Sequence, residues 1–322
     1  MSFRFAYVLS LLFSEFLIAN CQESSYGPGY QTILINNPAF AGSESDGILR
    51  LSYMNFYPGN NYNLHSVFVS YDTYMPLLHG GAGIFLADDY LGGIVNDTRG
   101  GFSYSYHLQA NKNIFINAGL SASFYHRGFN RGNIILPDQI DPINGAVYPS
   151  GENIVSRGRT VLDLGAGFLL ITGKFLGGIS LSHLTQPDLG GIANSEDRIK
   201  RKLNVNISYG FDAGKKKQLL IVPVFWGEIQ GDRITAGAGG SVGSNVLMFN
   251  SVFLVNRAKD LDLQAGFSIR KGIMLLFYNY CFNIKSENTL VPVSLLHQAG
   301  LAVSLHNVDK RKVIKTINLP KL

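Results

Sequence analysis

Apolar and polar residues alternate strictly along several stretches of the chain. The clearest is residues 203–212, where every second residue from Leu203 to Phe211 is apolar or aromatic and those between are Asn, Ser, Gly or Asp. Residues 114–125 repeat the pattern, and residues 64–73 follow it less strictly. Because successive side chains of a strand point to opposite faces, this period of two predicts β-strands with one apolar and one polar face.

Stretches of this kind recur from residue 48 to residue 305. Each has close to the ~9 to 11 residues that a tilted strand needs to cross a bilayer, and no window approaches the ~20 apolar residues of a spanning helix. The fourteen predicted strands are residues 48–56, 64–73, 80–88, 98–108, 114–126, 161–171, 174–184, 203–212, 217–227, 232–242, 246–256, 261–269, 272–283 and 294–305.

The connections between these stretches alternate in length. Short gaps such as 172–173 and 270–271 follow even-numbered stretches, whereas 127–160, 185–202 and 284–293 follow odd-numbered ones. Bacterial barrels place short turns in the periplasm and longer loops outside, and a sheet in lipid must close because its edge groups need partners. We therefore predict an all-β protein, a transmembrane antiparallel β-barrel of about 14 strands, with both termini in the periplasm.

The first residues have the layout of a secretory signal. Arg4 supplies a positive charge, residues 8–18 are mostly apolar, and the small or polar Ala19 and Asn20 follow. Cys21 leaves lipidation open as an alternative, although Asn20 is not the small residue that such sites prefer. The organisation that we expect is a signal peptide over 1–21, a periplasmic lead-in or plug over 22–47, the barrel over 48–305 and a basic periplasmic tail over 306–322.

Composition agrees with a sheet that turns apolar side chains toward something other than water. Charged residues make up 15% of the chain, against roughly 25% in soluble proteins. The net charge is +5, and basic residues gather near 198–202, 215–217 and 310–315. Because no aromatic platform accompanies them, we interpret them as loop and tail charge rather than as a nucleic-acid site. Cys281 is expected to be an inert thiol, either buried or facing lipid.

No group of residues forms a convincing catalytic or cofactor site. Ser182 and His183 are adjacent, but neighbours on a strand point to opposite faces, and His183 shares its predicted face with the apolar Ile179, so we expect a structural or interfacial histidine. Asp88–Asp89 is expected to be a solvated pair at a loop mouth rather than a cation site. Gly80–Gly83 lacks the ending of a phosphate loop, and glycines in strands mark bends or close contacts. We predict neither enzyme activity nor a cofactor or metal.

One stretch resembles the N-terminal signature of a known family. Residues 30–42 are a Gln-led segment that runs into Asn-Pro-Ala-Phe-Ala-Gly, and this resembles the PorP/SprF family. Further segments resemble motifs of the same family in the right order, and the resemblance spans roughly residues 28–305. These segments are residues 81–89, 104–108, 141–142, 163–168 and 178–187.

The resemblance implies a role in the type IX secretion system of Bacteroidota, which exports large proteins and, in gliding species, adhesins. Family members work in the outer membrane with a periplasmic ring built from a lipoprotein and its partner. By resemblance, this chain would be a barrel that docks or anchors that ring, secreted cargo or an adhesin.

We also expect contacts with partners in two segments. The turn-forming residues before the first strand can fold over or into the barrel mouth, although a simple plug or strand lead-in explains them equally well. The candidate partner-contact residues are Asn36, Asn37, Pro38, Phe40, Lys310, Arg311, Lys312 and Lys315.

Two other functions stay open at this point. The same barrel would serve as an outer-membrane channel for small or hydrophobic solutes, because the sequence does not reveal what fills the lumen. Phe68 and Tyr125, on predicted inward faces, could fill part of it. An outer-membrane lipid-modifying enzyme is a third interpretation, disfavoured by the absence of a suitable Ser-His arrangement.

Overall fold

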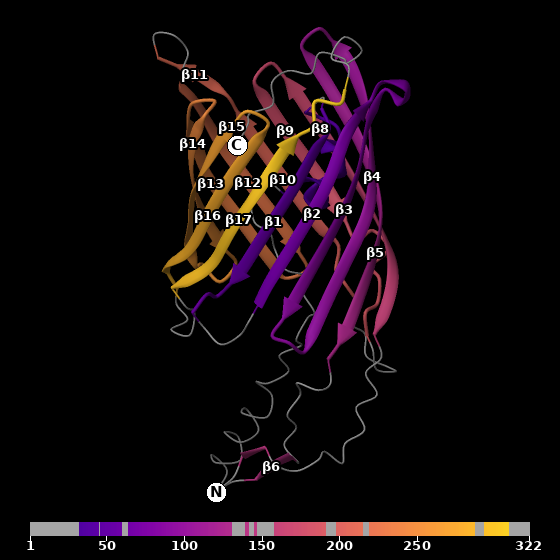
Figure 1. Cartoon of the computed structure of the whole chain (residues 1–322), viewed down its shortest axis with the longest axis vertical. Coiled ribbons are helices and arrows are strands. Elements are labelled where there is room, and N and C mark those ends of the chain that lie inside the picture. The colour runs from indigo at the N-terminus through magenta and orange to yellow at the C-terminus, as the bar shows by residue number, and fades with distance from the viewer. Residues whose placement is uncertain are drawn as a thin grey trace, which may run out of the picture.

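The structure, a computed structural model, describes residues 32–44, 46–59, 64–130, 139–141, 145–146, 158–190, 198–214, 219–286 and 293–308. Strands that follow one another along the chain pair antiparallel, and the last pairs with the first, with Ile48 opposite Ser304, so that the sheet closes into a barrel (Figure 1). The fourteen-stranded barrel predicted from the alternation is confirmed. No helix among the described residues is long and apolar enough to cross a membrane.

The strand bounds follow the predicted ranges closely, and the first strand matches its range at both ends. The barrel strands are β1 (Ile48–Phe56), β2 (Leu64–Met75), β3 (Gly80–Leu91), β4 (Val95–Asn111), β5 (Ile114–Phe129), β8 (Arg159–Thr172), β9 (Phe175–Ser182), β10 (Lys202–Tyr209), β12 (Leu219–Gln230), β13 (Arg233–Gly243), β14 (Leu247–Asn256), β15 (Leu261–Lys271), β16 (Met274–Lys285) and β17 (Ser294–Ser304). Outside the barrel, β6 (Ile140–Asp141) pairs with β7 (Gly145–Ala146).

The strand predicted over 203–212 is interrupted. It ends as β10 at Tyr209 and resumes after Gly210 as the short β11 (Phe211–Ala213). The pairing of β10 with β12 stops at Ser208 opposite Val224, and the pairing of β11 begins at Phe211 opposite Ile221. Pro223 lies opposite this gap and has no N–H to donate to the ladder, which accounts for the break.

The alternation along the strands separates the lumen from the outer surface. On β2, Ser66, Ser70 and Asp72 point inward and are buried, whereas Val67 between them is exposed on the outside. On β5, Asn117 is fully buried and Leu120 is 66% exposed. Apolar residues therefore cover the outer surface, and polar residues line much of the lumen, as the sequence pattern predicts.

The two ends of the barrel differ in their connections. One end, which we call the turn end, carries the short links 76–79, 112–113, 173–174, 214–218, 244–246 and 272–273, together with the start of β1 and the end of β17. The other, the loop end, carries the longer links 57–63, 130–158, 183–201 and 286–293. The predicted alternation of length holds except at 92–94, 231–232 and 257–260, which lie at the loop end and are short.

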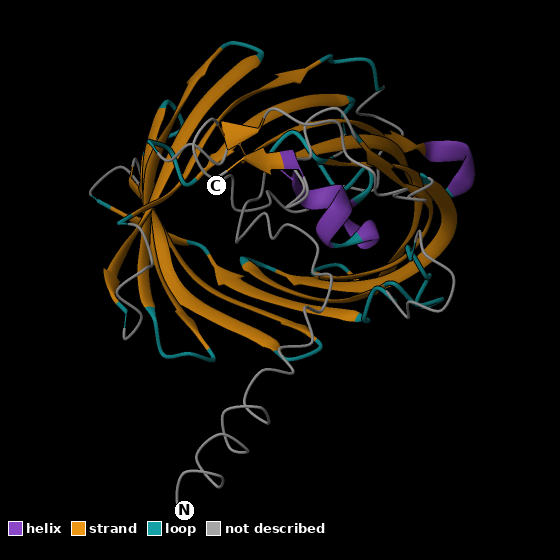
Figure 2. Ribbon diagram, turned by 90° about the horizontal axis from the view of Figure 1, so that it is seen from below, coloured by secondary structure: helices purple, strands orange, loops and turns teal. Residues whose placement is uncertain are grey.

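Apolar side chains meet across part of the lumen. Met54 and Phe68 of β1 and β2 are fully buried against residues of the facing strands, and the ring of strands is oval (Figure 2). Trp226 of β12 and Val252 and Leu254 of β14 are the facing residues, and Ala87 of β3, Leu296 of β17 and Cys281 of β16 complete this cross-lumen cluster. Phe68 fills part of the lumen, as expected. Cys281 is buried, which is one of the two environments that we expected for it.

Candidate functional site: the luminal segment and the charged network

The residues that precede β1 lie inside the barrel. We call residues 32–44 the luminal segment; it forms α2 (Ile33–Asn36) and η2 (Pro38–Phe40), and Figure 2 shows these helices within the ring of strands. Leu34, Ala39 and Phe40 are at most 4% exposed. They pack against Phe115 of β5, Leu169 of β8 and other apolar residues of the wall.

Local sequence explains the shape of this segment. Asn37 has extended backbone dihedrals and ends α2, and its side-chain oxygen accepts a hydrogen bond from Ala39 N at 2.9 Å. Pro38 is the first residue of η2, where its fixed φ suits a helix and its missing N–H costs nothing. Gly42 ends the turn with φ +65°, a value that favours glycine. The Asn-Pro-Ala-Phe-Ala-Gly stretch therefore forms a compact turn.

The segment is tied to β8 and β9 through its two asparagines. The Asn37 side chain donates to the carbonyls of Phe168 and Ile179 at 3.3 and 3.4 Å. Ser180 Oγ donates to the Asn36 carbonyl at 2.5 Å. β8 and β9 begin more than a hundred residues after these asparagines. The motif is therefore held by residues that are distant along the chain.

Three further strands hold the end of the segment. The carbonyl of Ala39 accepts hydrogen bonds from Ser105 Oγ at 2.9 Å and from Asn117 Nδ2 at 3.4 Å. His107 Nε2 lies 3.1 Å from the Ala41 carbonyl, and the Asp72 carboxylate accepts from Gly42 N at 2.9 Å. Buried backbone groups of an irregular segment need such partners. The inward polar residues of β2, β4 and β5 supply them.

Glycines in the wall make room for the segment. A Cβ atom at Gly81 would lie 2.1 Å from the Ala41 carbonyl oxygen, and one at Gly119 would lie 2.3 Å from Ala39 N. A Cβ at Gly167 would lie 2.1 Å from the side-chain oxygen of Asn37. The expectation that the Gly80–Gly83 run marks close contacts is confirmed at Gly81, and glycine is needed here because the backbone of the segment touches the wall.

The structure brings together one of the two sets of predicted contact residues. Asn37, Pro38 and Phe40 are buried against the wall, and Asn36 is half-buried. Lys310, Arg311, Lys312 and Lys315 lie outside the described residues. A contact of either set with another protein stays a prediction.

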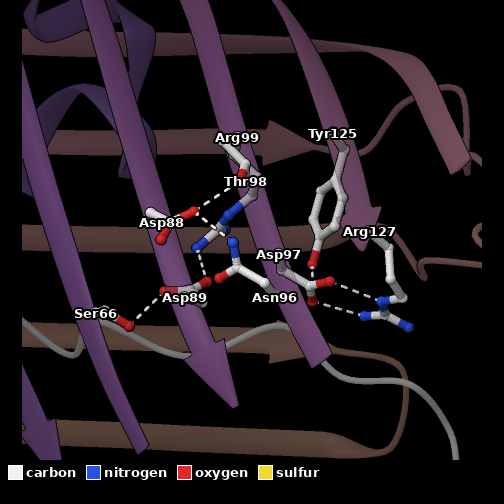
Figure 3. A network of polar contacts seen from close by, with 9 residues as sticks. All are labelled: Ser66, Asp88, Asp89, Asn96, Asp97, Thr98, Arg99, Tyr125 and Arg127. Atoms are coloured by element: carbon white, nitrogen blue, oxygen red, sulfur yellow. Dashed lines mark hydrogen bonds and ion pairs between the residues drawn. The ribbon is translucent and has the colours of Figure 1, made fainter. Parts of the chain in front are cut away.

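Buried ion pairs surround the lumen toward the loop end, and we call them the charged network (Figure 3). Arg99 pairs with Asp89 at 2.6 Å, and Ser66 Oγ also donates to Asp89. Arg127 donates twice to Asp97, each time at 2.7 Å, and the Tyr125 hydroxyl donates to the same carboxylate at 2.7 Å. Buried charges of this kind need partners.

The expectation that Asp88 and Asp89 form a solvated pair is wrong for Asp89. Asp89 is 1% exposed and paired with Arg99, not solvated. Because β3 continues to Leu91, the two carboxylates point to opposite faces, and Asp88 accepts hydrogen bonds from Asn96 and Thr98 on the outer side (Figure 3).

The network continues on β8 to β13. His183 Nδ1 lies 2.7 Å from the Asp163 carboxylate, which also accepts from Thr185 Oγ1 at 2.7 Å. Arg233 pairs with Glu228 at 2.5 Å, and Lys202 is 1% exposed. A small cavity of about 40 Å³ is lined by Asp163, His183 and Lys202 together with Leu34 and Ile35 of the luminal segment.

The face predicted for His183 is wrong. β9 ends at Ser182, and His183 adopts φ +58°, which turns its side chain into the lumen rather than to the side of Ile179. Its contact with Asp163 fits the structural role that we expected. Among the described residues, no three His, Cys, Asp or Glu side chains are grouped closely enough to hold a metal ion.

The sequence contains a signal for the charged network. Arg99 falls on the polar face of the strand predicted over 98–108, and Arg127 and Lys202 extend the polar faces of two other predicted strands by one residue. In a barrel with apolar outer faces, charges at such positions must point into the lumen and find partners there. The partners themselves depend on strand register.

Comparison with solved structures supports the barrel fold. The toluene transporter TbuX of Ralstonia pickettii is 13% identical, with a TM-score of 0.50, over 84% of this chain and 91% of that one. A deltaS2S3 mutant of TodX, a monoaromatic hydrocarbon channel, is 11% identical, with a TM-score of 0.51, over 85% of this chain and 94% of that one. At such identities the likeness concerns the fold alone. No curated protein matches the sequence.

A family model identifies the chain more specifically. The model described as type IX secretion system membrane protein PorP/SprF matches residues 20–293. The match includes the luminal segment, the glycines that accommodate it and the charged network. This chain therefore belongs to the PorP/SprF family of type IX secretion system membrane proteins.

Proposed function

We propose that this chain is a docking barrel that holds the periplasmic ring of the type IX secretion system, a lipoprotein and its partner, or a secreted protein at the outer membrane. Family membership supports a place in the secretion system. The observation that favours docking over transport is the luminal segment, which is buried and hydrogen-bonded to β2, β4, β5, β8 and β9. Because part of the chain occupies the lumen, we expect other proteins to bind at the two ends of the barrel rather than to pass through it.

We place the turn end in the periplasm, because bacterial barrels have short periplasmic turns. Both ends of the barrel chain then lie on the periplasmic side, since Ile48 pairs with Ser304. The basic tail after residue 305 would lie beside the ring and could bind an acidic surface. For Asn36, Asn37, Pro38 and Phe40 a role in docking would be indirect, because these residues already contact the barrel wall.

The alternative is an outer-membrane channel for small or hydrophobic solutes. The two solved structures named above are described as a transporter and a channel, but the likeness to them concerns only the fold. The cross-lumen cluster and the luminal segment both occupy space that a solute would need. We therefore rank docking first.

Co-purification tests the role of the tail. We expect that changing Lys310, Arg311, Lys312 and Lys315 to Gln lowers recovery of the ring components severalfold when the tagged mature protein is extracted from outer membranes in mild detergent. The physical reason is the loss of four positive charges that would attract an acidic partner. The bound proteins are identified by mass spectrometry.

A matched control removes charge at the same end of the barrel. Lys215, Lys216 and Lys217 lie in the link between β11 and β12 at the turn end, and their change to Gln should leave recovery unchanged. Equal recovery with both variants would exclude the tail as the contact. Purification of the unaltered barrel with neither a ring component nor a secreted protein would contradict the docking role itself.

A further inference from the structure

The link between β2 and β3 carries an exposed apolar group at the turn end. It forms η3 (Pro76–Leu78), in which Leu77 is 94% exposed and Leu78 is 51% exposed. The next link along the chain at the same end, Lys112–Asn113, is polar, and the apolar residues of other links there, such as Val246 at 61%, are less exposed than Leu77. A hairpin link needs no leucine, so this one requires an explanation beyond the turn itself.

The link folds outward rather than toward the lumen. The Tyr104 hydroxyl donates to the Leu78 carbonyl at 2.7 Å, and Tyr104 lies on the outer face of β4. His107 N donates to the His79 carbonyl at 2.9 Å, which fixes the end of the link on the same strand. Figure 2 shows η3 at the outer edge of the ring, away from the luminal segment.

The link is continuous with the apolar outer surface of the barrel. On β4, Phe102 and Tyr106 flank Tyr104 on the outer face and are 51% and 46% exposed. This surface faces lipid in a membrane protein of this fold, and aromatic residues gather where it meets the headgroups. Because η3 is held against that surface, its leucines extend the lipid-facing side.

We infer that the β2–β3 link anchors one side of the barrel in the membrane, with Leu77 and Leu78 inserted at the boundary between phospholipid headgroups and acyl chains. Removing a leucine side chain from water is favourable, and apolar residues beside aromatic ones are typical of elements that lie in this boundary. The hydrogen bond from Tyr104 fixes the link against the outer face of β4, beside these aromatic residues. The anchor goes beyond the docking role, since its ligand is lipid.

Tryptophan fluorescence tests this inference in the purified mature protein. Leu77→Trp is placed in phosphatidylcholine vesicles with or without bromine on shallow acyl positions, and the emission of the unaltered protein is subtracted. That emission comes from Trp226 alone, which is buried in the lumen. The matched control is Lys112→Trp, in the polar link between β4 and β5 at the same end.

We expect the added emission at position 77 to be shifted to the blue and quenched by brominated lipid at least twofold more than at position 112. Leu78→Trp should behave like Leu77→Trp, which guards against a local effect of one substitution. Water-like emission and weak quenching at both 77 and 78 would overturn the inference. Equal strong quenching at 77 and 112 would also overturn it, because the link would then be no different from its neighbours.

Discussion

Single residues decide whether the luminal segment fits. Gly81, Gly119 and Gly167 lie on three different strands, and at each a Cβ would come within 2.3 Å of an atom of residues 37–41. Protein interiors are packed too closely to absorb an added atom against backbone without a shift. The wall is therefore complementary to this segment residue by residue.

Gly119→Ala should loosen the segment. Its new Cβ would meet Ala39 N and the Pro38 carbonyl carbon, which are backbone atoms and cannot rotate away, so we expect the free energy of unfolding to fall by about 1 to 3 kcal/mol. The measurement is guanidinium unfolding of the protein folded in detergent micelles. Gly227→Ala is the control, since nothing lies within 4 Å of its Cβ. The same loss in both variants would show that the segment is not the cause.

Secondary-structure elements follow from the sequence except where pairing decides their ends. The period of two predicts the strands because lipid and lumen select opposite residue types on the two faces. His183 turns inward because β9 stops at Ser182, and Asp89 is buried because β3 extends to Leu91. Both ends are set by pairing with neighbouring strands, since Leu91 lies opposite Leu64 and Val95, and Ser182 lies opposite Lys202. The break after Tyr209 depends in the same way on Pro223 of the partner strand.

Two groups of strands contact each other through the cross-lumen cluster, and Trp226 of β12 is its largest member. We expect Trp226→Ala to lower the free energy of unfolding by about 3 to 5 kcal/mol, because it leaves a cavity between the two walls. Phe225→Ala is the control on the same strand, since Phe225 points outward and is 46% exposed. Guanidinium unfolding in micelles compares them, and similar losses would argue that the walls do not support each other.

The whole molecule explains the Asn-Pro-Ala-Phe-Ala-Gly signature. From the sequence, a plug, a lead-in and a partner contact were equally compatible with these residues, because their partners are far away along the chain. Asn37 bonds to carbonyls 131 and 142 residues later. β8 and β9 come close to the segment only once the barrel has closed. The sequence therefore predicts the barrel and the motif separately, but it does not predict that the motif binds to the barrel wall.

Deleting residues 32–44 tests what the segment does for the whole barrel. We expect the unaltered mature protein to conduct few ions in planar bilayers, and the deletion to raise single-channel conductance severalfold, because it exposes the polar wall of a lumen wide enough for water. A variant lacking residues 309–322 should behave like the unaltered protein, since that deletion leaves the segment in place. If the unaltered barrel instead conducts as well as the deletion, the lumen is a path for solutes and the channel alternative replaces docking. If neither conducts, the cross-lumen cluster closes the barrel without help from the segment, and the signature then serves stability alone.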